Sequence, residues 1–153
     1  MTKYENLLVK ADKSGIKVKE IDFEGYEECG YYCNSKILIN RNLTEKQKYG
    51  VLAEELGHHF YTYGDIADQL KIENRKQEKF ARNWGYEKLV GIIDIINAYN
   101  TGARDRCEMS EYLNVTEEFL DASIQHYREK YGLYCEIDHY MVCFDPLGVL
   151  EMF

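Results

Sequence analysis

Apolar positions near the N-terminus first follow a helical period and then alternate strictly. Residues 2–13 predict a short helix, because their apolar side chains share one stripe: Tyr4, Leu7, Leu8 and Ala11. Residues 16–23 alternate between apolar and charged side chains, as a half-buried strand does. Residues 31–33 and 36–39 read as two further strands joined by a tight turn at Asn34-Ser35. Three strands in series with short connections favour a small antiparallel sheet.

A capping box begins the next predicted helix. In Thr44-Glu45-Lys46-Gln47, the Thr44 hydroxyl and the Gln47 side chain can each satisfy a first-turn amide group. We expect this helix to end near Tyr63 and to be followed by a linker, or a single helical turn, at residues 66–72. At about 100° per residue, its apolar side chains gather on one side: Tyr49, Leu52, Ala53, Leu56 and Phe60.

A further long helix is predicted from Glu73 to about Val90. One side carries Lys76, Lys79, Arg82 and Asn83, and we assign that side to solvent. The other side carries Asn74 and Glu78 with the small residues Ala81 and Gly85, which allow a second helix to approach closely. An acidic side chain that faces inward needs a partner, and a metal ion is one candidate.

The C-terminal third is predicted to be mainly helical. Residues 89–99 continue as helix, and residues 107–113 and a helix capped by Thr116 flank a turn at Asn114-Val115. Such a pair of helices often binds DNA, but residues 104–132 carry four Arg and Lys against seven Asp and Glu. A packed helical pair is therefore favoured over a DNA-binding one. Residues 133–153 alternate weakly and predict a terminal strand segment.

Composition indicates a soluble protein of one domain or one domain with a small appendage. The net charge of −8 makes non-specific binding to nucleic acid or to anionic membranes unfavourable. No apolar run approaches the length of a membrane span, and the first residues lack the form of a signal peptide. The five scattered cysteines, Cys29 and Cys33 among them, are interpreted as reduced thiols. We expect a cytoplasmic location.

The candidate chemistry lies in Glu54-Glu55-Leu56-Gly57-His58, within the helix that the capping box begins. On a helix, Glu54 and Glu55 lie four and three residues before His58, so the three side chains share one face. A hydrolytic metal site needs two ligands one turn apart and a carboxylate that activates water. The stretch has this arrangement, but it is one histidine short of H-E-x-x-H. The competing interpretation is a solvated acidic face, and His59 is more typical of a core-edge histidine than of a ligand.

This stretch resembles the H-E-L-G-H helix of the ImmA/IrrE family of metallopeptidases. Residues 74–84, with the pair Phe80-Ala81, resemble the second site helix of that family, and residues 111–120 and 127–132 resemble the helical tail of its phage and mobile-element branch. The resemblance implies an α+β, zincin-like fold with a small antiparallel three-stranded sheet packed on helices. It also implies a metallopeptidase domain at residues 1–100 and a helix-turn-helix-like tail at residues 101–153.

The resemblance implies a metal-dependent endopeptidase that cleaves, or helps to destroy, a helix-turn-helix repressor of a phage or mobile element. Carried over to this sequence, Glu55 is the general base, His58 is a metal ligand, and Glu54 stands in the place of the first histidine. The third ligand position falls on Asn74, and Glu78 is the nearest acid on the same face.

These positions predict a metal ion held by His58 and Glu54, with Glu78 or Asn74 as the third ligand. The predicted ion is Zn²⁺, and the exchange of an imidazole for a carboxylate shifts the preference toward harder ions such as Mn²⁺. The alternative is a catalytically degenerate family member, which binds a repressor or another protein without cleaving it.

Overall fold

The structure is a computed structural model that describes residues 1–25, 28–61 and 72–152. It divides the chain into two compact units, Met1–Gly85 and Tyr86–Phe153, which are described separately below. The boundary lies within one helix, and the division at residue 100 stays a prediction. The expected helix end near Tyr63 and nearly all of the expected linker lie outside the described residues. All five cysteines are free thiols.

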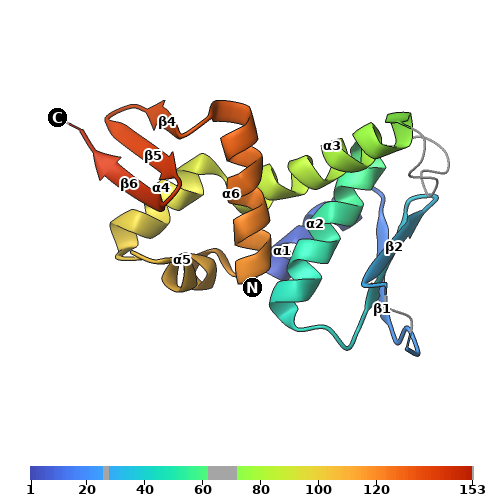
Figure 1. The fold of residues 1–153 in the computed structure, drawn as a ribbon. Coiled ribbons are helices and arrows are strands. Elements are labelled where there is room, and N and C mark those ends of the chain that lie inside the picture. Colours follow the sequence, from blue (N-terminus) through green and yellow to red (C-terminus); the bar gives the residue numbers. More distant parts are fainter. Residues whose placement is uncertain (26–27, 62–71, 153) are drawn as a thin grey trace. The chain divides into compact units, whose positions relative to one another are not determined.

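In the described part of the first unit there are three strands and three helices, the last of which continues into the second unit (Figure 1). The expected helices and strands all form, and the turn between the second and third strands is at Asn34 and Ser35, both with positive φ. In chain order the elements are α1 (Lys3–Lys13), β1 (Lys17–Ile21), β2 (Gly30–Cys33), β3 (Lys36–Asn40), α2 (Glu45–Tyr61) and α3 (Ile72–Leu89).

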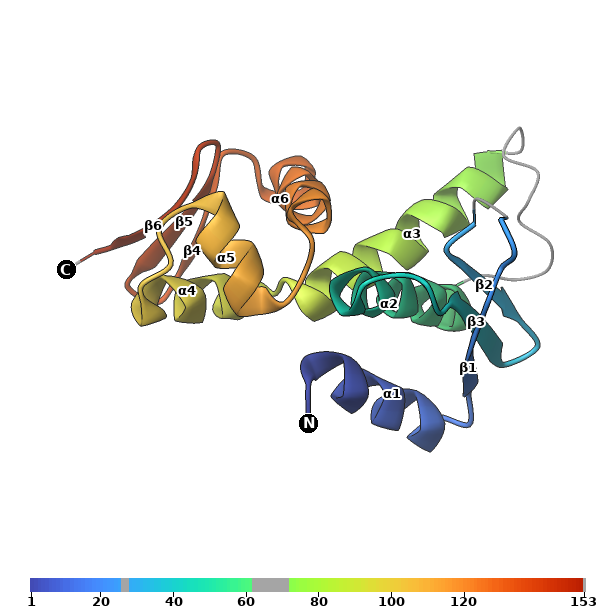
Figure 2. The same cartoon turned by 90° about the horizontal axis from the view of Figure 1, so that it is seen from below.

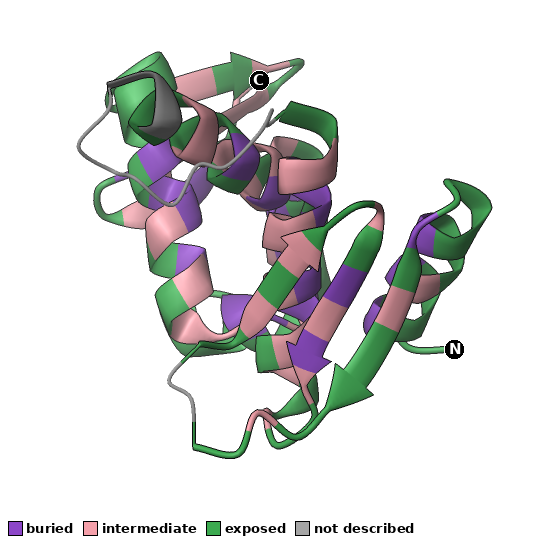
Figure 3. Ribbon diagram, turned by 90° about the vertical axis from the view of Figure 1, so that its right-hand side faces the viewer, coloured by how far each residue is buried: buried purple, intermediate pink, exposed green. Residues whose placement is uncertain are grey.

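The sheet of the first unit is mixed, so the expectation of a purely antiparallel sheet was wrong. The strand order is β1-β3-β2, with β1 parallel to β3 and β2 antiparallel to β3. The hairpin of β2 and β3 follows the prediction, but β1 pairs with β3 and in parallel. Strand β3 is the central strand, and its Ile37 and Ile39 are fully buried. Figure 3 shows the buried bands on this middle strand.

Helices α2 and α3 approach very closely because glycine and alanine meet where they cross (Figure 2). A Cβ atom placed on Gly57 would lie only 2.1 Å from the carbonyl oxygen of Ala81, so no larger residue fits without moving a helix. Gly85 meets Ala53 in the same way, at 3.3–3.4 Å. The prediction that small residues on α3 admit another helix is confirmed. This crossing brings the polar side chains of α2 and α3 together.

The second unit consists of helices followed by a sheet that was not expected in full. Gly91 interrupts the predicted continuous helix at residues 89–99, and its amide donates to the Asp94 carboxylate at 3.1 Å. Residues 134–151 form a complete antiparallel sheet, β4-β5-β6, where only a strand segment was predicted. The elements are α4 (Ile92–Thr101), α5 (Arg106–Leu113), α6 (Glu117–Tyr131), β4 (Tyr134–Ile137), β5 (Tyr140–Phe144) and β6 (Leu147–Glu151).

The helical pair α5 and α6 forms as predicted, with Asn114 in the left-handed conformation at the end of α5 and Thr116 capping α6. The α+β class is confirmed, and the C-terminal part is a mixture of helices and sheet rather than helical throughout. Among the helices that the structure describes, none combines the length and the apolar character that crossing a membrane requires.

Candidate metal centre

Helix α2 orients the acidic and imidazole side chains of the candidate centre. Its predicted capping box is present: Thr44 N–H donates to Gln47 Oε1 at 2.9 Å, and Gln47 N–H donates to Thr44 Oγ1 at 3.2 Å. Leu52, Ala53 and Leu56 are buried and fix the rotation of the helix. Glu54, Glu55 and His58 consequently lie together on the side that α3 crosses.

Three possible metal ligands converge where α2 crosses α3. One ligand atom from each of Glu54, His58 and Glu78 can be chosen so that all three lie within 4.8 Å of one another. His58 Nε2 lies 3.2 Å from Glu78 Oε2, and the two side chains are only 12% and 17% exposed. The structure thus brings together the three residues that the sequence singled out, two from α2 and one from α3. The side chain of Asn74 lies outside the described residues.

Arg82 completes this cluster, and the sequence analysis missed its role by assigning it to the solvent side of α3. Its Nε donates to Glu54 Oε1 at 3.0 Å and to Glu78 Oε1 at 3.1 Å. One guanidinium N–H therefore bridges the two carboxylates. The spacing of four residues between Glu78 and Arg82 was the available signal, since such pairs face each other on a helix.

The pair His58 and Glu78 favours its charged form. Burial lowers the pKa of His58, but the hydrogen bond to Glu78 and the charges of Glu78, Glu55 and Glu54 outweigh it and raise the pKa above its usual value. The hydrogen bond from His58 lowers the pKa of Glu78 against the opposing effect of burial, and Arg82 lowers it further. Opposite charges and a direct hydrogen bond stabilise both ionised groups.

Glu55 lies beside this pair with a perturbed carboxyl group. Burial raises its pKa to about 7, with the charge of His58 opposing the shift and the carboxylates of Glu54, Glu78 and Glu28 adding to it. Strand β2 lies against this side chain, since a Cβ atom on Gly30 would come within 3.2 Å of Glu55 Oε1. A carboxyl group with a pKa near neutrality can both accept and release a proton, as a general base must.

His59 does not belong to the cluster of three ligands. Its Nδ1 is hydrogen-bonded to the Tyr32 hydroxyl at 2.8 Å, and its ring contacts that of Phe60. This bond ties α2 to strand β2.

The donor set suits a divalent cation. Zn²⁺ accepts imidazole nitrogen and carboxylate oxygen, and Mn²⁺ accepts both with a stronger preference for oxygen. The three side chains offer one nitrogen and two carboxylates from two rigid helices, and they need only a small contraction to reach a common ion. Arg82 lies on both carboxylates, Glu54 and Glu78.

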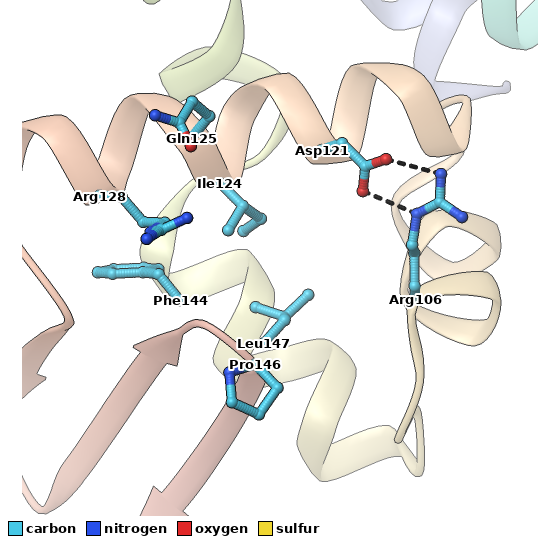
Figure 4. A pocket seen from close by; sticks show the side chains of 8 residues that line it. All are labelled: Arg106, Asp121, Ile124, Gln125, Arg128, Phe144, Pro146 and Leu147. Carbon is cyan, nitrogen blue, oxygen red and sulfur yellow. Dashed lines mark hydrogen bonds and ion pairs between the residues drawn. The ribbon is translucent and has the colours of Figure 1, made fainter.

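The second unit has a cavity of about 370 Å³ that serves as a contrast (Figure 4). Both of its arginines are paired: Arg106 with Asp121 at 2.6 and 2.7 Å, and Arg128 with Asp145 at 3.4 Å. It contains no imidazole. Its lining is Arg106, Asp121, Ile124, Gln125, Arg128, Phe144, Pro146 and Leu147. Among the described residues, the possible metal ligands therefore gather at the α2–α3 crossing and not in this cavity.

Comparison with known proteins identifies the family. Residues 11–125 match the family described as the IrrE N-terminal-like domain, a peptidase family, and this range includes both site helices. Searches of curated proteins and of solved structures gave no match. The match covers most of the chain and agrees with a zincin-like α+β fold, and a metallopeptidase family implies a divalent metal ion. The chain belongs to the ImmA/IrrE family of metallopeptidases.

Proposed function

We propose that the protein is a metal-dependent endopeptidase in which His58, Glu54 and Glu78 hold one divalent ion and Glu55 is the general base. The observation that carries this proposal is the convergence of the three possible ligands within 4.8 Å, next to the half-buried Glu55 carboxyl group. We propose Zn²⁺ as the ion, with Mn²⁺ as an alternative that two carboxylate ligands favour.

The chain's own residues supply the proton transfers and the positioning. When bound, a divalent ion supplies Lewis-acid activation of the attacking water and of the peptide carbonyl group. Glu55 accepts the proton that the attacking water loses and delivers it to the amine that leaves. In the metal-free chain, burial raises the pKa of this carboxyl group to about 7, a value at which it can both accept and release a proton. The Gly57–Ala81 contact keeps Glu78 in reach of the two ligands on α2.

The proposed substrate is a cytoplasmic repressor of the helix-turn-helix type, encoded by a phage or mobile element. The similarity of residues 111–120 and 127–132 to the phage and mobile-element branch supports this choice. The charge of the chain supports it too: a repressor binds DNA through a basic surface, and a net charge of −8 attracts such a surface.

Metal analysis combined with a cleavage assay tests the proposal. After loading with Zn²⁺ or Mn²⁺ and desalting, we expect about one ion per chain in the wild-type protein, as a single three-ligand site predicts. His58→Ala should lose the ion. The matched control is His139→Ala, which removes an exposed histidine paired with Asp138 and Glu151 in the second unit. A helix-turn-helix repressor encoded beside the chain's own gene should be cleaved, and a chelator should stop the cleavage. Wild-type protein that holds no ion after loading would refute the proposal.

A second candidate function is binding of the repressor without cleavage. Two observations favour it: Glu54 stands where the family pattern has a histidine, and Arg82 already neutralises Glu54 and Glu78. This candidate predicts a stable complex with the repressor that forms equally well in the presence of a chelator. It also predicts that the repressor in the complex stays intact.

A further inference from the structure

We propose that Arg82 is a resident counter-cation of the candidate metal centre: it holds Glu54 and Glu78 together in the metal-free chain and is displaced when a divalent ion binds. This inference rests on the proposed function, because it concerns the same centre. It adds a positioning residue that controls how tightly the ion is held.

The hydrogen bonds around Glu78 carry the first step. Both of its carboxylate oxygens are engaged, Oε1 by Arg82 at 3.1 Å and Oε2 by His58 at 3.2 Å. An ion that takes Glu78 as a ligand therefore binds a carboxylate that already has two partners. His58 is itself a proposed ligand, so an ion between His58 Nε2 and Glu78 replaces the hydrogen bond that joins them. The positive charge of Arg82 on the same carboxylate repels the ion, so Arg82 is the partner that leaves.

The position of Glu54 carries the second step. Its Oε1 accepts from the same Arg82 Nε at 3.0 Å, so a single N–H group bridges the two carboxylates that would bind the ion. Without a cation between them, two carboxylates at this separation repel each other. In the metal-free chain, Arg82 thus reduces the repulsion between the carboxylates of Glu54 and Glu78, as the ion would in the metal-bound chain.

Exposure makes the displacement feasible. The Arg82 side chain is 54% exposed and that of Glu54 is 37% exposed, whereas Glu78 is only 17% exposed. A guanidinium group at this position can turn into solvent and remain hydrated, so its departure does not bury an unpaired charge. The backbone of α3 stays in place, since Ala81 is fully buried against Gly57.

Two measurable consequences follow. The positive charge that must leave opposes the binding of a divalent ion, so a neutral residue at position 82 should strengthen binding by about tenfold or more. The same change removes the bridge between the carboxylates, so the metal-free variant should melt at a lower temperature than the wild type. Added metal should restore most of that loss, because it replaces the missing cation.

Calorimetric titration of the full-length, chelator-treated protein with Mn²⁺ and with Zn²⁺ tests this inference. Arg82→Gln should bind about tenfold tighter or more, and Arg82→Lys, which keeps the charge, should stay within about threefold of the wild type. The matched control is Lys76→Gln, an exposed position on α3 with the same loss of charge, which should change neither the affinity nor the melting temperature. His58→Ala reports whether the titrated ion occupies this centre.

The outcomes separate this inference from the proposed function. If the wild type binds metal in a His58-dependent way and Arg82→Gln binds equally or more weakly, Arg82 is not a displaced counter-cation, and the proposed function stands. If Arg82→Lys binds as tightly as Arg82→Gln, the charge of Arg82 is not what opposes the ion, and the inference fails. If neither the wild type nor Arg82→Gln binds metal, the proposed function fails as well.

Discussion

The two units of the molecule each contain a histidine, a glutamate and a cation in nearly the same geometry. In the first unit, His58 Nε2 lies 3.2 Å from one oxygen of Glu78, and Arg82 donates to the other oxygen. In the second unit, His126 Nε2 lies 3.2 Å from one oxygen of Glu87, and Lys130 Nζ donates to the other oxygen at 2.7 Å.

The surroundings of the two clusters differ. His58 has the carboxylates of Glu54 and Glu55 beside it, and Glu54 completes a set of three possible ligands. His126 instead contacts the aromatic rings of Tyr86 and Tyr127, and the structure shows no second carboxylate bonded to it among the described residues. A histidine paired with a glutamate therefore does not by itself mark a metal centre. A third possible ligand and the half-buried Glu55 beside it distinguish the candidate centre of the first unit.

The largest expected difference between the units is in catalysis. Glu55→Gln should lower the rate of repressor cleavage about a thousandfold, equivalent to about 4 kcal/mol, because it removes the general base. Glu87→Gln, the same change in the second unit, should leave the rate unchanged. The measurement is initial cleavage rates at equal metal loading. Cleavage by Glu55→Gln at the wild-type rate would show that the general-base assignment is wrong.

The next effect concerns the helix crossing that assembles the first cluster. Gly57→Ala should reduce the free energy of unfolding by about 3 kcal/mol, because the new methyl group meets the Ala81 carbonyl and forces α2 and α3 apart. Gly148→Ala in β6, where no atom lies within 4 Å of a new Cβ, should change it by less than about 0.5 kcal/mol. Urea unfolding measures both. Equal stabilities of the two variants would contradict the importance of this contact.

The two acidic residues Glu55 and Glu87 should give opposite pH dependences of stability in the metal-free protein. The pKa of Glu55 is raised from 4.5 to about 7, so the folded state binds more protons and this group costs stability as the pH rises from about 4.5 to about 7. Burial raises the pKa of Glu87, but hydrogen bonds from Lys130 and His126 outweigh it and lower the pKa. Glu87 therefore contributes stability above about pH 4.5, and that contribution is lost at lower pH.

These opposite effects on stability are tested by the free energy of unfolding, measured from pH 4 to 8. The proteins compared are the wild type, Glu55→Gln and Glu87→Gln. Glu55→Gln should remove a loss of at most about 3.5 kcal/mol between pH 4.5 and 7, since each pKa unit corresponds to about 1.4 kcal/mol. Glu87→Gln should be most destabilised, relative to the wild type, at neutral pH. Parallel curves for Glu55→Gln and the wild type would show that Glu55 does not titrate in this range.

The smallest effects concern one tyrosine in each unit. The Tyr127 hydroxyl donates to the Val90 carbonyl at 2.7 Å in a buried position, so Tyr127→Phe should cost about 1 to 2 kcal/mol of stability. Tyr32 bonds the imidazole of His59 in a half-buried position, so Tyr32→Phe should cost about 0.5 to 1 kcal/mol. Thermal unfolding gives both values. Neither variant should alter metal affinity, and a loss of affinity in Tyr32→Phe would show that His59 supports the centre directly.

The sequence by itself determined the local structure and half of the candidate centre. The capping box at Thr44, the turn at Asn34-Ser35 and the cap at Thr116 are interactions between residues close in the chain, so their patterns predicted them correctly. The shared face of Glu54, Glu55 and His58 follows from the helical repeat alone. The binding of metal by these residues stays a prediction.

The tertiary structure decided what depends on contacts between distant segments. The parallel pairing of β1 with β3 puts the strand with the buried Ile37 and Ile39 at the centre of the sheet, which no local pattern specifies. The complete sheet at the C-terminus arises because strands β4 to β6 pair with one another, although each alternates only weakly. Glu78 reaches His58, twenty positions earlier in the chain, only because Gly57 and Ala81 let two helices touch. Arg82 bridges Glu54 and Glu78 for the same reason: the helical repeat pairs it with Glu78, but only the helix crossing brings Glu54 to its other side.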